Sequence, residues 1–154
     1  MKIKWKPLII SLLISMGVAG ISALATMNSM ELYEGLTKPP LSPPGWVFGV
    51  VWTILFLLMG ISSYLIYVSD SENKKAALWV YAVQLAVNFL WSIIFFNLQL
   101  YWFAFGWLIL LWGLILAMLI LFSKISKPAA WLQVPYLLWV TFAGYLTLFV
   151  AMLN

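Results

Sequence analysis

The sequence predicts an all-α integral membrane protein, a bundle of five transmembrane helices that forms one domain over residues 1–154. Hydrophobic residues make up 66% of the chain and charged residues only 8%, whereas about a quarter of the residues in a soluble domain are charged. The charges also gather in short segments separated by long neutral stretches. A surface of this composition is compatible with lipid and not with water.

The neutral stretches divide the chain into five helices. Residues 39–69, 76–123 and 128–154 carry no charge, and the second stretch is 48 residues long, enough for two crossings of about 20 residues each. The apolar segment 7–27 supplies the remaining crossing. We place the helices at 6–27, 45–68, 77–97, 101–123 and 129–152, with a long loop at 28–44 and short links elsewhere.

The lysines predict how the bundle is oriented. With the N-terminus inside, seven of the eight basic residues fall on the cytoplasmic side, and only Lys38 lies on the other. Positively charged short loops stay cytoplasmic. We therefore expect the N-terminus to be cytoplasmic, and the C-terminus and first loop to be outside.

The first segment has a second interpretation, as a cleavable secretory signal. It has lysines at positions 2–6, then an apolar run and the small-residue site Ala23-Leu24-Ala25. The run is longer than the 7–15 residues of a usual signal core, which favours a membrane helix.

The long loop is expected to be structured. Asn28 and Glu31 have the spacing of a capping box, and Gly35 is placed to end a short helical turn. Two proline pairs at 39–40 and 43–44 then stiffen the chain. Such a loop either covers a cavity or simply connects two helices.

Aromatic and polar side chains repeat at helical spacing and predict a pocket inside the bundle. The inward-facing sets are Phe48, Trp52, Phe56 and Gly60; Gln84, Asn88 and Ser92; and Trp139, Ala143 and Thr147. Together they offer flat walls, an amide and small residues that leave room. The alternative is ordinary packing, with the amides as interhelical hydrogen bonds and with Gly45–Gly49 and Ala82–Ala86 as helix or homodimer contacts.

Several chemistries lack the residues they need. The chain has no cysteine and no histidine, so we predict no metal site and no resident cofactor. Its four acidic residues all lie in predicted loops, which disfavours ion-coupled transport and hydrolysis. The lysines flank membrane spans and form no basic patch, so nucleic acid is not an expected partner.

Three ordered segments resemble the translocator protein family, also called tryptophan-rich sensory proteins or peripheral benzodiazepine receptors. The segments are residues 33–60, 88–97 and 135–143. The resemblance implies a five-helix bundle, often a homodimer, whose cavity under the first loop binds porphyrins and isoquinoline carboxamide or benzodiazepine-type drugs. By motif position it also implies the pocket residues Tyr33, Trp52, Asn88, Trp139 and Ala143, to which Phe56 is added.

The chain departs from the family pattern at three positions. No Lys or Arg follows Tyr145, as one does in the cholesterol-recognition segment of animal members. Leu32 stands where a tryptophan is common, and Thr147 where an asparagine is common. We therefore expect a bacterial, porphyrin-oriented member.

Three functions remain open from the sequence. The first is a receptor for protoporphyrin IX or another flat hydrophobic ligand, held between Trp52 and Trp139 and oriented by Asn88, with Lys38 available to a carboxylate. The second is an enzyme that degrades porphyrin with light or oxygen, with Trp52 and Trp139 as catalytic residues. The third is a ligand-regulated scaffold or transporter.

Overall fold

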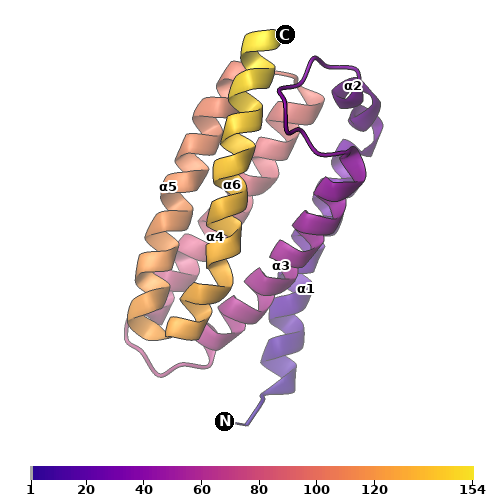
Figure 1. Cartoon of the computed structure of the whole chain (residues 1–154). Helices are drawn as coiled ribbons and strands as arrows, with labels where there is room; N and C mark the ends of the chain where they lie inside the picture. Colours follow the sequence, from indigo (N-terminus) through magenta and orange to yellow (C-terminus); the bar gives the residue numbers. More distant parts are fainter. Residues whose placement is uncertain (1) are drawn as a thin grey trace.

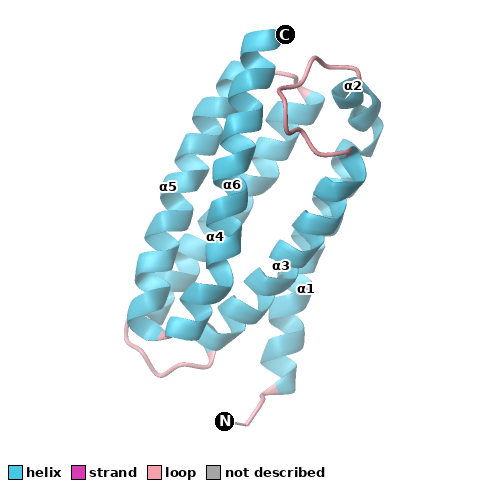
Figure 2. Ribbon diagram, in the orientation of Figure 1, coloured by secondary structure: helices cyan, strands magenta, loops and turns pink. Residues whose placement is uncertain are grey.

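The computed structural model describes residues 2–154, and these form helices with no strand (Figures 1 and 2). Five helices are long and apolar enough to cross a membrane, which confirms the predicted fold class. They are α1 (Trp5–Thr26), α3 (Gly45–Tyr67), α4 (Lys74–Ser92), α5 (Tyr101–Ile125) and α6 (Lys127–Leu153). Three short elements complete the fold: η1 (Met27–Ser29), α2 (Met30–Glu34) and the π-helical η2 (Ile93–Asn97).

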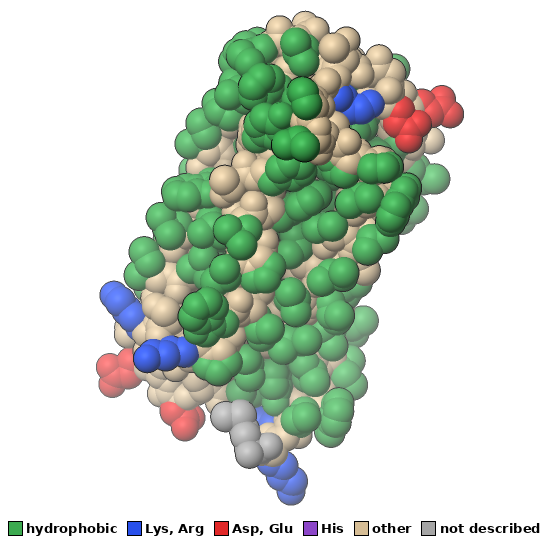
Figure 3. Space-filling view, in the orientation of Figure 1, with side chains coloured by type: hydrophobic (Ala, Val, Ile, Leu, Met, Phe, Trp, Pro, Cys, Tyr) green, Lys and Arg blue, Asp and Glu red, His purple; other side chains and the backbone are tan. Residues whose placement is uncertain are grey.

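The helices run roughly alongside one another, and the two ends of the chain lie at opposite ends of the bundle (Figure 1). The main pairs are α5 with α6 and α1 with α3, and α4 packs against α5, α3 and α1. Hydrophobic side chains cover most of the visible face, and the charges lie at its two ends (Figure 3). Because the backbone of each helix is hydrogen-bonded internally, this arrangement suits a hydrocarbon solvent.

The two ends differ in charge. One end carries seven lysines and two carboxylates, a net charge of +5, and we call it the lysine-rich end; the other carries one lysine and two carboxylates, a net charge of −1. The residues of the lysine-rich end are Lys2, Lys4, Lys6, Asp70, Glu72, Lys74, Lys75, Lys124 and Lys127.

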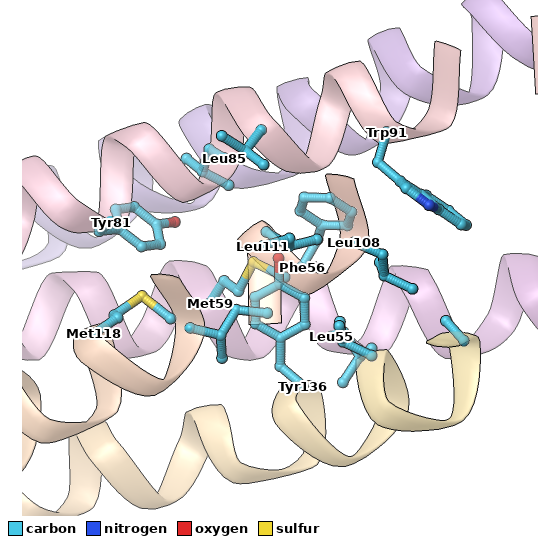
Figure 4. Packing of buried hydrophobic residues seen from close by; sticks show 14 of the residues in the cluster. Leu55, Phe56, Met59, Tyr81, Leu85, Trp91, Leu108, Leu111, Met118 and Tyr136 are labelled. Carbon is cyan, nitrogen blue, oxygen red and sulfur yellow. The ribbon is translucent and has the colours of Figure 1, made fainter. Parts of the chain in front are cut away.

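The core consists of large side chains from α3, α4, α5 and α6. Met59, Leu111, Met118 and Tyr136 are fully buried, and Figure 4 shows them converging between the helices. Such interlocking packing holds membrane helices together, since burial from lipid alone contributes little driving force.

Helices α1 and α3 approach each other closely at Gly60 of α3. A Cβ atom there would lie 2.6 Å from Ser15 Oγ and 2.8 Å from the Leu12 side chain of α1. The sequence predicted that Gly60 leaves room in a pocket, and this prediction is wrong. Side chains of α1 occupy the space beside Gly60, so Gly60 allows the two helices to pack closely, as small residues do in membrane helix contacts.

The start of the short helix α2 also differs from the prediction. The expected capping box of Asn28 and Glu31 does not form, because α2 begins after Ser29, whose φ of −96° and ψ of −6° are helical rather than extended. The Ser29 hydroxyl instead donates to Asn97 Oδ1 at 2.5 Å. Gly35 does end the helix, as predicted.

Candidate functional site

A cavity of about 350 Å³ lies under the segment that joins α1 to α3. We call this segment, residues 27–44, the roof segment, and the space below it the roof cavity. Its walls come from α1, α3, α4, η2 and the roof segment: Ala19, Ser22, Ala23, Thr26, Met27, Met30, Gly45, Phe48, Gly49, Trp52, Thr53, Phe56, Asn88, Trp91, Ser92 and Phe96. The volume lies in the range of ligand pockets, which are mostly apolar with a few polar groups.

A much smaller space of about 20 Å³ adjoins the roof cavity on the side of α6. It is room for about one water molecule. Phe48, Trp52, Trp91 and Phe96 line both spaces, so these four rings form the wall between them. The α6 side of the small space is lined by Trp139, Ala143, Leu146 and Thr147.

The six residues predicted for the pocket are therefore divided by this wall. Phe56 and Asn88 line the roof cavity, Tyr33, Trp139 and Ala143 line the small space, and Trp52 lines both. The structure places them around one region of the bundle, in two adjoining compartments.

Trp52 is held in the wall by edge-on contacts. Its ring centroid lies 6.4 Å from that of Trp139, with the planes at 89°, and 6.3 Å from that of Tyr136, at 71°. Phe48 meets Trp139 in a similar way at 5.7 Å. Perpendicular pairs are favourable for aromatic quadrupoles, so the two indoles do not form parallel plates in this state.

The Asn88 amide is engaged by the core of the bundle. Asn88 Nδ2 donates to Tyr136 Oη at 2.6 Å, and Tyr136 Oη donates to Gln84 Oε1 at 2.7 Å. This chain joins α4 to α6 and explains why Gln84 does not line the cavity. A ligand in the roof cavity would meet an amide already fixed in position by Tyr136.

Trp91 is a site residue that the sequence reasoning passed over. It lines both compartments, stacks on Phe95 at 5.2 Å, and its indole Nε1 is buried with no hydrogen-bond partner within residues 2–154. Trp139 Nε1 is likewise buried with no hydrogen-bond partner within residues 2–154. The signal was present in the sequence, because Trp91 follows Asn88 by three residues and so lies on the same helix face.

The roof segment is fastened at both sides of the site. On one side, the Ser29 hydroxyl of the segment donates to Asn97 Oδ1 of η2, and Asn97 Nδ2 in turn donates to Ala25 O at the end of α1 at 2.8 Å. On the other side, Tyr145 donates to Pro40 O at 2.8 Å, and the Asn154 amide donates to Thr37 O at 2.8 Å and accepts from Thr37 N at 3.1 Å. The segment is therefore tied to η2 on one side and to α6 on the other.

Lys38 forms its hydrogen bonds within the roof segment. Its ammonium donates to Glu34 O at 2.9 Å and Tyr33 O at 3.3 Å, and lies 5.0 Å from the centre of the Tyr33 ring. A cation at the end of a helix satisfies its free carbonyl groups. Lys38 therefore caps α2 and fixes Tyr33 over the small compartment.

Gly45 and Gly49, predicted as a helix or homodimer contact, lie on the roof cavity within this chain. Both line the roof cavity, and nothing lies within 4 Å of a Cβ built on Gly49. This pair widens the cavity.

The fold and site define an integral membrane protein of five helices with an aromatic cavity under a fastened roof. The sequence model of the TspO/MBR family matches residues 9–153, and the chain belongs to this family. It is 37% identical to the tryptophan-rich protein TspO of Chlorobaculum tepidum over 149 residues, which cover 96% of this chain and 94% of that protein.

Other relatives carry different names. The chain is 40% identical to protein CrtK of Rhodobacter capsulatus, over 79% of this chain and 78% of that protein. It is 39% identical to the translocator protein of Ovis aries, over 74% and 69% respectively. The resemblance inferred from three motifs is thus confirmed.

Proposed function

We propose that the chain is a membrane receptor for flat hydrophobic ligands, chiefly a metal-free porphyrin such as protoporphyrin IX, and that the roof cavity is its binding site. The observation that carries this proposal is a cavity walled by Phe48, Trp52, Phe56, Trp91 and Phe96 within the membrane-spanning bundle. Aromatic faces favour flat π-systems. The unpartnered indole N–H of Trp91 is a donor for a carboxylate or carbonyl of the ligand.

Trp52 decides how large a ligand the site accepts. A small aromatic drug fits the roof cavity as it stands, whereas a tetrapyrrole extends into the space beside Trp139 when the Trp52 indole turns away. The edge-on contacts of Trp52 oppose such a turn, but each is worth only about 0.5–1.5 kcal/mol, so a bound ligand can displace the indole.

The test is a titration of protoporphyrin IX followed by its visible absorbance, with the protein in detergent and in darkness. Loss of one aromatic contact of about 1.5 kcal/mol predicts roughly tenfold weaker binding by Trp52→Ala. Trp79→Ala is the matched control, because Trp79 is 72% exposed and lines none of these spaces. Equal affinities of the two variants would refute the site.

Light-dependent breakdown of the bound porphyrin is a second proposal, and the supporting observation is the 6.4 Å distance between the Trp52 and Trp139 rings. Both indoles are easily oxidised and adjoin the ligand space. Illumination in air is expected to give a new absorbing product with the wild type and none with Trp52→Phe combined with Trp139→Phe. The same product from the double variant would exclude this role.

We further propose a homodimer in a bacterial cell membrane, with the lysine-rich end cytoplasmic. Positive charge at one end of the bundle supports this orientation. Of the pair Ala82 and Ala86, Ala86 is exposed on α4 beside a groove against α1 and away from the lysine-rich end, a surface suited to close helix contact. A mass from light scattering that stays dimeric in Ala86→Phe would exclude this interface.

A further inference from the structure

A second and larger cavity, of about 570 Å³, lies at the lysine-rich end of the bundle. It is formed by α1, α3 and α4, and the proposed receptor function makes no use of it. We call it the lysine-end cavity. Its lining is Lys6, Pro7, Ile10, Ser11, Ile14, Ser63, Tyr67, Leu78, Tyr81, Ala82 and Leu85.

The cavity exists because α1 is attached to α3 and stands away from α4. The Lys4 backbone N–H donates to Tyr64 Oη at 2.8 Å, and further along the two helices meet at Ser15 and Gly60. These two contacts hold this stretch of α1 against α3, and the contact of α1 with α4 is much less extensive. The space left between α1 and α4 is the cavity.

The cavity has a buried floor and a rim that faces the membrane. Ser63 is 4% exposed, and Tyr81 and Leu85 are each 6% exposed, whereas Ile10 of the rim is 47% exposed and Ala82 is also exposed. An amphiphile can therefore enter sideways from the bilayer. Ile14 follows Lys6 by eight positions on α1, a rise of about 12 Å along the helix.

The polar groups of the cavity are ordered by depth. Lys6 and Tyr67 are at the mouth, and Ser63 lies one turn further in on α3 than Tyr67. Tyr81, on the floor, has a buried hydroxyl that forms no well-directed hydrogen bond within residues 2–154, and it faces the hydroxyls of Ser63 and Ser15. A ligand that brings an acceptor to this depth gives the Tyr81 hydroxyl a partner.

We propose that the lysine-end cavity binds one anionic phospholipid. The phosphate lies at the mouth beside Lys6, an ester carbonyl accepts a hydrogen bond from Tyr81, and one acyl chain fills the apolar space lined by Ile10, Ile14 and Leu85. The net charge of +5 at this end favours an anionic head group over a zwitterionic one.

The test is native mass spectrometry of the full chain in detergent, titrated with dioleoyl phosphatidylglycerol, dioleoyl phosphatidylcholine or oleate. Ala82→Phe fills the rim of the cavity, and Ala86→Phe is its matched control, since Ala86 is exposed one turn away and does not line the cavity. Lys6→Gln is compared with Lys75→Gln, which lies at the same end outside the lining.

We expect one phosphatidylglycerol per chain, bound more tightly than phosphatidylcholine. Ala82→Phe should weaken it at least tenfold and Lys6→Gln about fivefold, whereas Ala86→Phe and Lys75→Gln leave it unchanged. Equal binding of both phospholipids, or equal losses in the control variants, would overturn the proposal. Oleate binding as tightly as phosphatidylglycerol would assign the cavity to a free carboxylate and also overturn it. Porphyrin titration of the same variants reports separately on the roof cavity.

Discussion

Replacing Gly60 by alanine is expected to destabilise the bundle, although alanine is the better helix former. The added Cβ atom would lie 2.6 Å from Ser15 Oγ, 2.8 Å from Leu12 Cδ2 and 3.2 Å from Leu12 Cα. The two side-chain atoms can rotate away. The third belongs to the backbone, so α1 itself must move away from α3.

The size of the effect follows from two opposing contributions. Overpacking of this kind costs about 1–3 kcal/mol, and alanine gains about 1 kcal/mol over glycine within a helix. Because a backbone atom is among the contacts, the upper half of the first range applies. The net loss in the free energy of unfolding is then about 1–2 kcal/mol, which lowers the melting midpoint by roughly 2–8 °C.

The assay is thermal unfolding in detergent followed by far-ultraviolet circular dichroism. Gly113→Ala is the control, because nothing lies within 4 Å of a Cβ at Gly113, and its midpoint should equal or exceed that of the wild type. Adding Ser15→Gly to Gly60→Ala removes the nearest contact and should restore part of the loss. A midpoint of Gly60→Ala at or above the wild-type value would refute the reasoning.

Three further substitutions test the roof segment and the core. Leu41→Gly should raise the free energy of unfolding by about 1 kcal/mol, and with it the melting midpoint, because Leu41 has a φ of 75° that only glycine adopts without strain. Tyr136→Phe should lower the free energy of unfolding by about 1–3 kcal/mol, and with it the melting midpoint, because Gln84 loses a buried hydrogen bond. Asn154→Ala should speed amide hydrogen exchange in residues 35–44, because two bonds to Thr37 are lost.

Each of these has a control and a contradicting result. Leu32→Gly, in the helix α2, should lower the melting midpoint. If Leu32→Gly raised the midpoint as much as Leu41→Gly does, the strain argument would be wrong. Tyr67→Phe, at a 53% exposed position, should be neutral, and a loss equal to that of Tyr136→Phe would remove the hydrogen-bond explanation. For Asn154→Ala, unchanged exchange in the roof segment would show that these bonds do not fasten it.

The helices follow from the sequence because their cause is local. The absence of charge over residues 39–69, 76–123 and 128–154 is a property of each segment alone. The observed ends lie close to those expected, although the helix α4 begins at Lys74 rather than at residue 77. Its outer end continues as the π-helix Ile93–Asn97, and such a widened turn has no clear signal in residue propensity.

The partners of the small and polar residues could not be read from spacing. The periodicity correctly placed Trp52 and Phe56 on the cavity. The same periodicity assigned Gly60 to the pocket, whereas the structure places it against α1. Gly45 and Gly49, predicted as a helix or homodimer contact, line the roof cavity within this chain. Which glycine meets another helix depends on how α1 crosses α3, a property of the assembled bundle.

The hydrogen bond between Asn88 and Tyr136 could not be predicted from the sequence either. The two residues are 48 positions apart in the chain, and nothing near either one indicates the other. An amide with helical spacing predicts an inward direction, but its partner is decided by tertiary packing.

The position of the exposed residues around the roof cavity has a consequence for measuring affinity. Ala23, Met27, Gly49 and Thr53 belong to its lining and are exposed on α1, α3 and the turn above, so the cavity opens towards the hydrocarbon while the roof segment is fastened on the aqueous side. A ligand bound there as proposed would exchange with the pool dissolved in the bilayer. Its occupancy would depend on the mole fraction in lipid, and an apparent Kd expressed in bulk concentration would rise in proportion to the lipid or detergent added.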